Sequence, residues 1–115
     1  MTVLFAPRPL LAATQATLFI DSAEPQQAAL AAEINQALFY SPTLRAALTV
    51  TVFDINPNAH PFNGEVIYHI DSDGKAVAQY RPGRLPYLFC QADGKTRTHF
   101  TVSNKDQLCL CINLG

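Results

Sequence analysis

The first half of the chain alternates short apolar runs with one stretch of helical periodicity. The runs ATLFIDS (Ala16–Ser22) and LTVTVFDI (Leu48–Ile55) are continuous and apolar, which predicts two buried strands. Between them a leucine or isoleucine recurs every four residues, at Leu30, Ile34 and Leu38. That spacing places the three side chains on one face of a helix and predicts that this face is buried.

Both ends of this helix carry residues that start or stop helices. Ser22 is of a type that caps helix N-termini, and Glu24 and Pro25 suit a first turn. Pro42 predicts an end near Tyr40, because the residue before a proline avoids the helical region. Upstream, Thr2–Ala6 predicts a short strand, and the segment PRPLLAATQ that follows predicts a short helix.

The second half is richer in strand and turn signals. The apolar run PYLFCQA leads to Asp93-Gly94 and then to alternating Thr96, Thr98 and Phe100, which predicts a β-hairpin. Two segments stay ambiguous at this level. EVIYHIDSDGKAVAQY fits either a second hairpin or a strand followed by a helical turn, and SNKDQLCLCINLG fits either a short helix or a last strand.

The order of these elements predicts an α/β fold. Strands that alternate with helices, followed by a hairpin, indicate a central mixed sheet of four to five strands with helices on both faces. An alternative keeps the helix but makes everything after Glu65 an antiparallel meander, which would give an α+β interaction protein.

Composition supports one folded domain spanning residues 1–115. Of the 115 residues, 49% are hydrophobic and 15% charged, with a net charge of −1, so the chain is globular rather than disordered. No basic stripe and no membrane-length apolar run are present, so neither nucleic acid nor a membrane is an expected partner.

The three cysteines, Cys90, Cys109 and Cys111, are odd in number and clustered near the C-terminus. Such a set is no disulfide framework and suits a reducing compartment, so we expect a cytoplasmic protein with free, buried thiols. The alternative is an exported protein, with residues 1–16 as a signal peptide.

Three segments resemble the thioredoxin-like fold family. The segment AQYRPGRLPYLFCQADGK is similar to the part of that family that runs through its cis-proline strand and the hairpin after it. LTVTVFDINPN resembles the family's central strand, and SNKDQL resembles the start of its last helix. The resemblance implies a cis peptide bond before Pro86, beside the family's active site, and makes residues 57–79 an insertion before the cis-proline strand.

The chain departs from that family where its redox chemistry is done. The family carries Cys-x-x-Cys at the start of the helix after the first central strand, and Ala23-Glu24-Pro25-Gln26 stands there in this sequence. Thioredoxin-type exchange at that place is excluded, because no thiol is present to become a thiolate.

The sequence therefore predicts a redox-inactive thioredoxin-like binding or assembly module, with no catalytic residue, cofactor or metal. An unidentified protein partner is expected, and a homo-oligomer formed through a sheet edge is compatible with the pattern. The resemblance places the binding groove at eight residues: Asp21, Ser22, Ala23, Glu24, Pro25, Leu85, Pro86 and Tyr87.

The main alternative is an enzyme with a thiol- or glutathione-linked activity that uses Cys90 or the Cys109/Cys111 pair. Ser22 is a further candidate for a nucleophile or a glutathione-activating group, although helix capping already explains a serine there. Histidine and aspartate side chains are scattered without metal-site spacing: His60, His69, His99, Asp54, Asp71 and Asp73.

Overall fold

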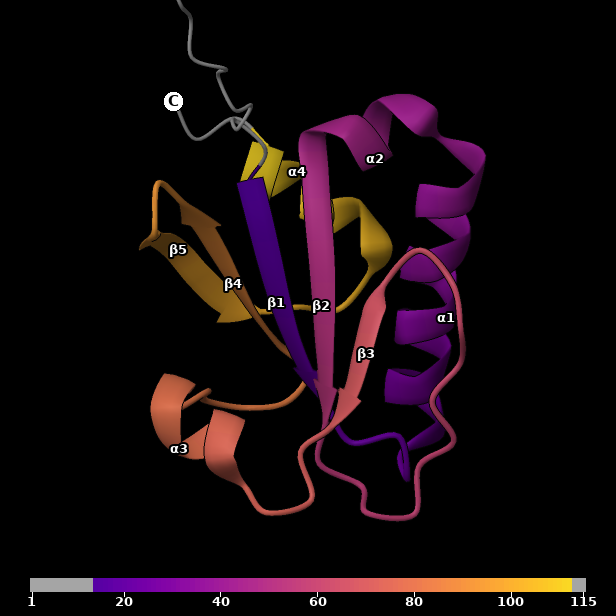
Figure 1. Ribbon diagram of the computed structural model, residues 1–115, viewed down its shortest axis with the longest axis vertical. Helices are drawn as coiled ribbons and strands as arrows, with labels where there is room; N and C mark the ends of the chain where they lie inside the picture. The colour runs from indigo at the N-terminus through magenta and orange to yellow at the C-terminus, as the bar shows by residue number, and fades with distance from the viewer. Residues whose placement is uncertain (1–13, 113–115) are drawn as a thin grey trace, which may run out of the picture.

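The computed structural model describes residues 14–112, which form one five-stranded mixed sheet flanked by helices (Figure 1). The strand order is β3-β2-β1-β4-β5. At the centre, β1 (Thr14–Ile20) runs parallel to β2 (Leu48–Asp54) and antiparallel to β4 (Tyr87–Ala92). The predicted mixed α/β sheet is confirmed, and both predicted central strands exist within two residues of their expected bounds.

The long helix α1 (Pro25–Tyr40) buries the face that the sequence predicts. Leu30, Ile34 and Leu38 are at most 4% exposed. The helix ends at Tyr40, and Ser41 then caps the short helix α2 (Pro42–Ala47) by accepting the N–H of Leu44. The capping role predicted for Ser22 is wrong, because the N-cap of α1 is Glu24 and its side chain makes no capping hydrogen bond.

The segment before β4 contains a strand and a helix. β3 (Ile67–Ile70) pairs in parallel with β2, and α3 (Lys75–Tyr80) follows it. Asp71 fixes the start of α3, because its carboxylate accepts the N–H groups of Ala76 and Val77. A strand followed by a helical turn is therefore correct, and the antiparallel meander is wrong because β3 pairs in parallel. The description of residues 57–79 as an insertion stays a prediction.

The predicted hairpin joins β4 to β5 (Lys95–Thr101) through Asp93-Gly94. Both turn residues have positive φ, 56° and 75°, which aspartate and glycine tolerate better than most residues. The Leu85–Pro86 peptide bond, just before β4, is cis. Pro86 costs the sheet no hydrogen bond, because it precedes the first ladder pair of β4, Tyr87 with Thr101.

The C-terminal segment is helical rather than a strand. It forms the 3₁₀ turn η2 (Lys105–Leu108) and one turn of α-helix, α4 (Cys109–Ile112). Asn104 and Gln107 begin this segment with a reciprocal capping box.

Helices cover both faces of the sheet, as predicted. On one face, α1 and the C-terminal segment pack on Leu18, Val50 and Leu88. On the other, α3 packs on Phe19 and Phe89; Figure 1 shows α1 and α3 on opposite sides. None of the helices in residues 14–112 has the length and apolar character of a membrane span. The strand and helix predicted for residues 2–15 lie largely outside the described residues.

Candidate functional site

The predicted groove contains a cavity of about 640 Å³ between the start of α1 and the start of β4. Four of the eight predicted residues line it: Glu24, Pro25, Leu85 and Pro86. The other walls come from α1 and from the end of β5, through Gln26, Gln27, Leu30, Thr101, Val102 and Ser103. The two segments that the resemblance pairs are therefore neighbours in space, although a ligand for the cavity stays a prediction.

The other four predicted residues do not line the cavity. Asp21, Ser22 and Ala23 lie in the loop before α1, and Tyr87 lies on the other face of the sheet. Asp21 accepts the N–H of Ala23 on its own carboxylate, and its backbone N–H donates to Gln27, so it shapes the turn into α1. Ser22 accepts a hydrogen bond from the Asn56 side chain. Tyr87 lies on the α3 side of the sheet, with the aromatic cluster around Phe19.

A buried carboxylate holds the loop before α1 in place. Asp54 ends β2, is 0% exposed, and accepts the backbone N–H groups of Ser22 and Asn56 on Oδ1, both at 3.0 Å. The Tyr68 hydroxyl donates to Oδ2 at 2.6 Å. Three donors, one of them from β3, therefore satisfy both oxygens of a fully buried carboxylate.

Burial, together with the hydrogen bond to Asp54 and its charge, raises the pKa of Tyr68 well above its ordinary value of about 10. A raised folded-state pKa gives a contribution to stability that is complete below the unfolded-state pKa and is lost as pH rises toward the folded-state pKa. We expect Tyr68→Phe to lower the free energy of unfolding by about 1.5 kcal/mol at pH 7, because a hydrogen bond to a charged group is lost.

The pH dependence separates this effect from simple loss of packing. In urea unfolding, the wild type should lose stability above about pH 10 more steeply than Tyr68→Phe does. Tyr40→Phe, at a ring that is 72% exposed, is the matched control and should follow the wild-type curve. Parallel curves for wild type and Tyr68→Phe would show that Tyr68 is not held protonated by Asp54.

The cysteines contradict the expectation of three free thiols. Cys90 of β4 and Cys111 of α4 form a disulfide, and both residues are 0% exposed. The expectation is wrong because an odd count of three does not argue against pairing: one buried pair and one free cysteine satisfy the same count. Cys109 is the free, exposed thiol, two residues before Cys111.

The disulfide and the cavity lie at different places along β4. Pro86 stands before the first residue of β4, whereas Cys90 is four residues further on, opposite Ala16 of β1. At about 3.3 Å per residue this separates the two by about 13 Å along the strand. The cysteine chemistry of this chain is thus distant from the Ala23–Gln26 position.

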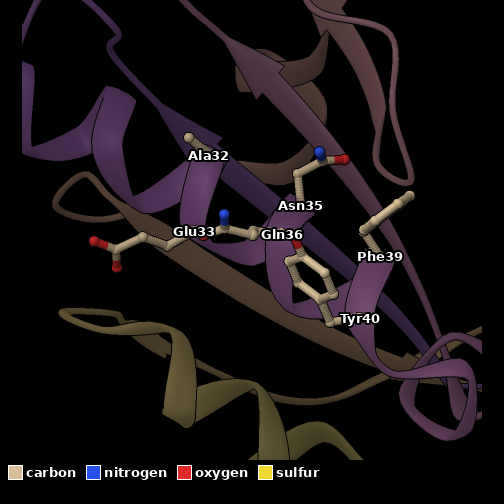
Figure 2. A pocket seen from close by; sticks show the side chains of 6 residues that line it. All are labelled: Ala32, Glu33, Asn35, Gln36, Phe39 and Tyr40. Carbon is tan, nitrogen blue, oxygen red and sulfur yellow. The ribbon is translucent and has the colours of Figure 1, made fainter.

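A second hollow, of about 320 Å³, lies on the outer surface of α1 (Figure 2). It is lined by Ala32, Glu33, Asn35, Gln36, Phe39 and Tyr40. The rings of Phe39 and Tyr40 meet edge to face and are 58% and 72% exposed. Nothing among the described residues covers these two rings.

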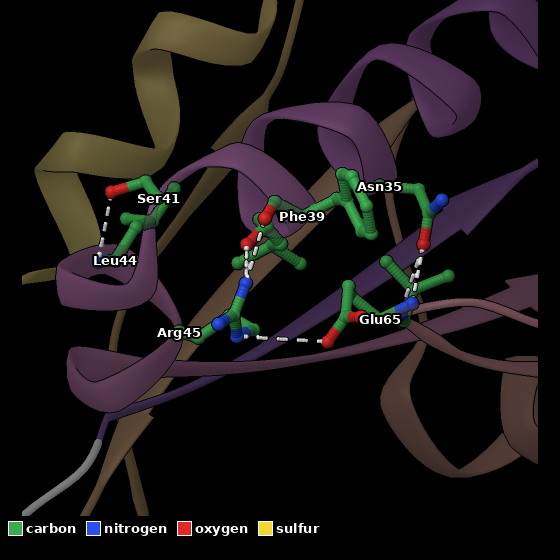
Figure 3. Close-up of polar contacts among 8 residues, drawn as sticks. Asn35, Phe39, Ser41, Leu44, Arg45 and Glu65 are labelled. Atoms are coloured by element: carbon green, nitrogen blue, oxygen red, sulfur yellow. Dashed lines mark hydrogen bonds and ion pairs between the residues drawn. The ribbon is translucent and has the colours of Figure 1, made fainter.

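Polar contacts next to this hollow tie α1 to the segment before β3 (Figure 3). Asn35 accepts the backbone N–H groups of Glu65 and Val66. Arg45 donates to the carbonyl oxygens of Leu38 and Phe39 and lies 3.8 Å from the Glu65 carboxylate. Both side chains therefore have a structural role. Arg45 satisfies carbonyl groups that the end of α1 leaves without a partner, and Asn35 satisfies two backbone N–H groups of the segment before β3.

The scattered histidines and aspartates do not meet. In residues 14–112 no three histidine, cysteine or acidic side chains are grouped as a metal ion requires. His69 stacks on Phe53, and His99 stacks on Phe89. Asp54 and Asp71 instead bind backbone N–H groups.

Sequence reasoning missed the pairing of Cys90 with Cys111 and the acceptor role of Asp54, although the pattern indicates that all three side chains are buried. Asp54 continues the inward positions of β2, two residues after Val52. Cys90 stands two residues after the buried Leu88. Cys111 stands three residues after the buried Leu108, which is helical spacing.

Comparison with known proteins identifies the fold. No protein-family model and no curated protein sequence matches the chain. Among solved structures, StoA from Bacillus subtilis matches with a TM-score of 0.63 at 12% identity, over 87% of this chain and 82% of StoA. A secreted Mycobacterium tuberculosis disulfide oxidoreductase homologous to E. coli DsbE matches with a TM-score of 0.63 at 20% identity, over 90% of this chain and 82% of that one.

Trxlp from Edwardsiella tarda EIB202 also matches, with a TM-score of 0.57 at 14% identity, over 89% of this chain and 84% of that one. Likenesses at these identities establish the fold, which is thioredoxin-like, as the sequence resemblance implies. The prediction of a redox-inactive binding module is wrong. The finding that overturns it is the disulfide formed by the chain's own Cys90 and Cys111, which favours the thiol-linked alternative.

Proposed function

We propose that this thioredoxin-like chain takes part in thiol–disulfide exchange through its three C-terminal cysteines. The observation that carries the proposal is the Cys90–Cys111 disulfide. Cys109, which stands two residues before Cys111 in the sequence, has a free and exposed thiol. A disulfide stores two oxidising equivalents, and a nearby thiol is the group that can transfer them.

Accessibility assigns different roles to the cysteines. Cys90 and Cys111 are 0% exposed, so a partner's thiol does not reach their sulfur atoms while α4 is folded. Cys109 is exposed and is therefore the cysteine that meets the partner. The buried disulfide holds the oxidising equivalents, and Cys109 carries them to the surface.

Transfer requires α4 to open by one turn. Residues two apart on a helix point to different sides, so Cys109 reaches Cys111 only when this turn unwinds. A helix of four residues has little stability of its own, which makes this opening inexpensive.

The exchange balances in three steps. The Cys109 thiolate attacks Sγ of Cys111, a Cys109–Cys111 bond forms, and Cys90 leaves as a thiolate that takes up a proton. A thiolate of a dithiol partner protein then attacks Sγ of Cys109 and releases Cys111 as a thiol. The partner's second thiolate attacks the partner sulfur and releases Cys109, so the partner gains a disulfide, and Cys90 and Cys111 end as thiols.

A persistent disulfide suits an oxidising compartment, in place of the cytoplasmic location expected from the cysteine count. Thr14, Ala16 and the residues after them belong to β1 and pair with β2. Cleavage of a signal peptide after residue 16 would therefore remove part of the central strand, so an export signal would have to end before Thr14.

The test measures oxidation of a synthetic peptide that contains two cysteines. Oxidised wild-type protein should oxidise the peptide stoichiometrically. Cys109→Ser should keep the Cys90–Cys111 disulfide but oxidise the peptide at least about tenfold more slowly, because the sole exposed thiol of the described residues is gone.

The matched control is a variant in which the exposed thiol stands on α1 instead of α4. Cys109→Ser combined with Ala32→Cys restores an exposed thiol on α1, far in sequence from the disulfide, and should stay inactive. Equal rates for wild type and Cys109→Ser, or full activity in the double variant, would contradict the proposed role of Cys109.

A further inference from the structure

The charges of this chain are divided between its two halves. Residues 14–74 carry seven acidic residues and one basic residue, a net charge of −6. Residues 75–103, which form α3, β4 and β5, carry five basic residues and one acidic residue, a net charge of +4. Although the net charge of the whole chain is −1, residues 75–103 therefore form a basic region.

Part of this region lies in the segment where α3 leads into β4 and on the strands that this segment contacts. Arg81 and Arg84 are exposed and flank Pro82-Gly83. The Tyr87 hydroxyl is 2.7 Å from Nδ1 of His99, which is also exposed. The backbone on either side of Arg84 meets these strands, because Gly83 lies against the Tyr87 ring and the Arg84 carbonyl accepts the Thr101 hydroxyl. We call Arg81, Arg84, Tyr87 and His99 the basic patch.

No ion pair within the described residues explains the two arginines of the patch. Within residues 14–112 neither guanidinium makes an ion pair, whereas Arg45 and Arg97 each lie beside a carboxylate. Arg81 also has a φ of 53°, at the C-cap of α3, where glycine is the least strained residue. An arginine held at this position costs stability without a compensating contact in the described structure.

We infer that the basic patch binds an acidic polypeptide segment of a partner protein. Arginine guanidinium groups match carboxylates in geometry as well as in charge, and the hydrogen-bonded pair of Tyr87 and His99 adds polar groups to the patch. The inference concerns a surface separate from the cysteines and holds whether or not they exchange disulfides. A nucleic acid is disfavoured, because the chain has a net charge of −1 and seven of its nine acidic residues lie in residues 14–74.

The experiment measures binding of a fluorescent eight-residue polyglutamate peptide at low salt. Wild-type protein should bind it with an affinity that falls as salt rises. Arg84→Ala and Arg81→Gly should each weaken binding at least about fivefold. Lys105→Ala, which removes an exposed charge outside the patch, is the matched control and should bind like wild type.

Arg81→Gly separates binding from folding. Relief of the positive φ should raise its urea unfolding midpoint while its affinity falls, so weaker binding cannot result from a damaged fold. Equal losses in Lys105→Ala, or no peptide binding by wild type at millimolar concentration, would overturn the inference.

Two other outcomes would overturn it by identifying a different occupant. Tighter binding of an eight-nucleotide oligothymidylate than of polyglutamate would assign the patch to nucleic acid. Concentration-dependent self-association of the wild type, lost in Arg84→Ala, would assign the patch to the acidic half of a second copy.

Discussion

Reduction of the Cys90–Cys111 disulfide is expected to lower the free energy of unfolding by about 3 kcal/mol. The bridge joins residues 21 apart in sequence, and closing a loop of that length removes roughly this much conformational freedom from the unfolded chain. It also ties α4, a helix of one turn, to the central sheet. The measurement is urea unfolding of oxidised and reduced wild-type protein, monitored by circular dichroism.

Two variants make this comparison specific. Cys109→Ser should show the same difference between oxidised and reduced protein, because Cys109 is not in the bridge. Cys90→Ala combined with Cys111→Ala should be insensitive to reductant. The prediction fails if reduction leaves the unfolding curve of the wild type unchanged although the bridge was intact beforehand.

Asp54→Ala is expected to destabilise the fold by about 3 kcal/mol. The substitution leaves three donors without their acceptor: the backbone N–H groups of Ser22 and Asn56 and the hydroxyl of Tyr68. Each unsatisfied buried donor costs about 1–3 kcal/mol, and water reaches the half-buried Ser22 and Asn56 well enough to lower the sum.

Asp54→Asn tests whether the loop needs both carboxylate oxygens of Asp54 or only a side chain of the same shape. It keeps one oxygen for the two backbone donors but loses the acceptor for Tyr68, so we expect a loss of about 1–2 kcal/mol. Glu33→Ala, at an exposed position of α1, is the control and should stay within about 0.5 kcal/mol of wild type. Equal stability of Asp54→Ala and wild type would show that Asp54 does not hold this loop.

Local patterns predicted most of the fold because they reflect burial directly. The four-residue spacing from Leu30 to Leu38 and the apolar run of β2 each identify one element and one buried face. The pairing of strands, in contrast, depends on residues that are far apart in the sequence. Residues 65–80 became a parallel edge strand and a helix because β2 had a free edge and Asp71 a free carboxylate, neither of which a sequence window displays.

The functional prediction failed for a related reason. Absence of thiols at Ala23–Gln26 excludes exchange at that place alone, yet the inference was extended to the whole chain. Cys90 and Cys111 lie on different elements and meet only because β4 and α4 pack together. The homo-oligomer and the lack of a nucleic-acid partner stay predictions.

The most direct test of the account is disulfide mapping by peptide mass spectrometry after acid quenching, before and after addition of one equivalent of glutathione disulfide or reduced glutathione. We predict a Cys90–Cys111 bridge with Cys109 free in the untreated oxidised protein, and glutathione attached to Cys109 after treatment with either reagent. Three free cysteines in the untreated protein, or glutathione on Cys90 or Cys111 in place of Cys109, would contradict thiol–disulfide exchange through Cys109.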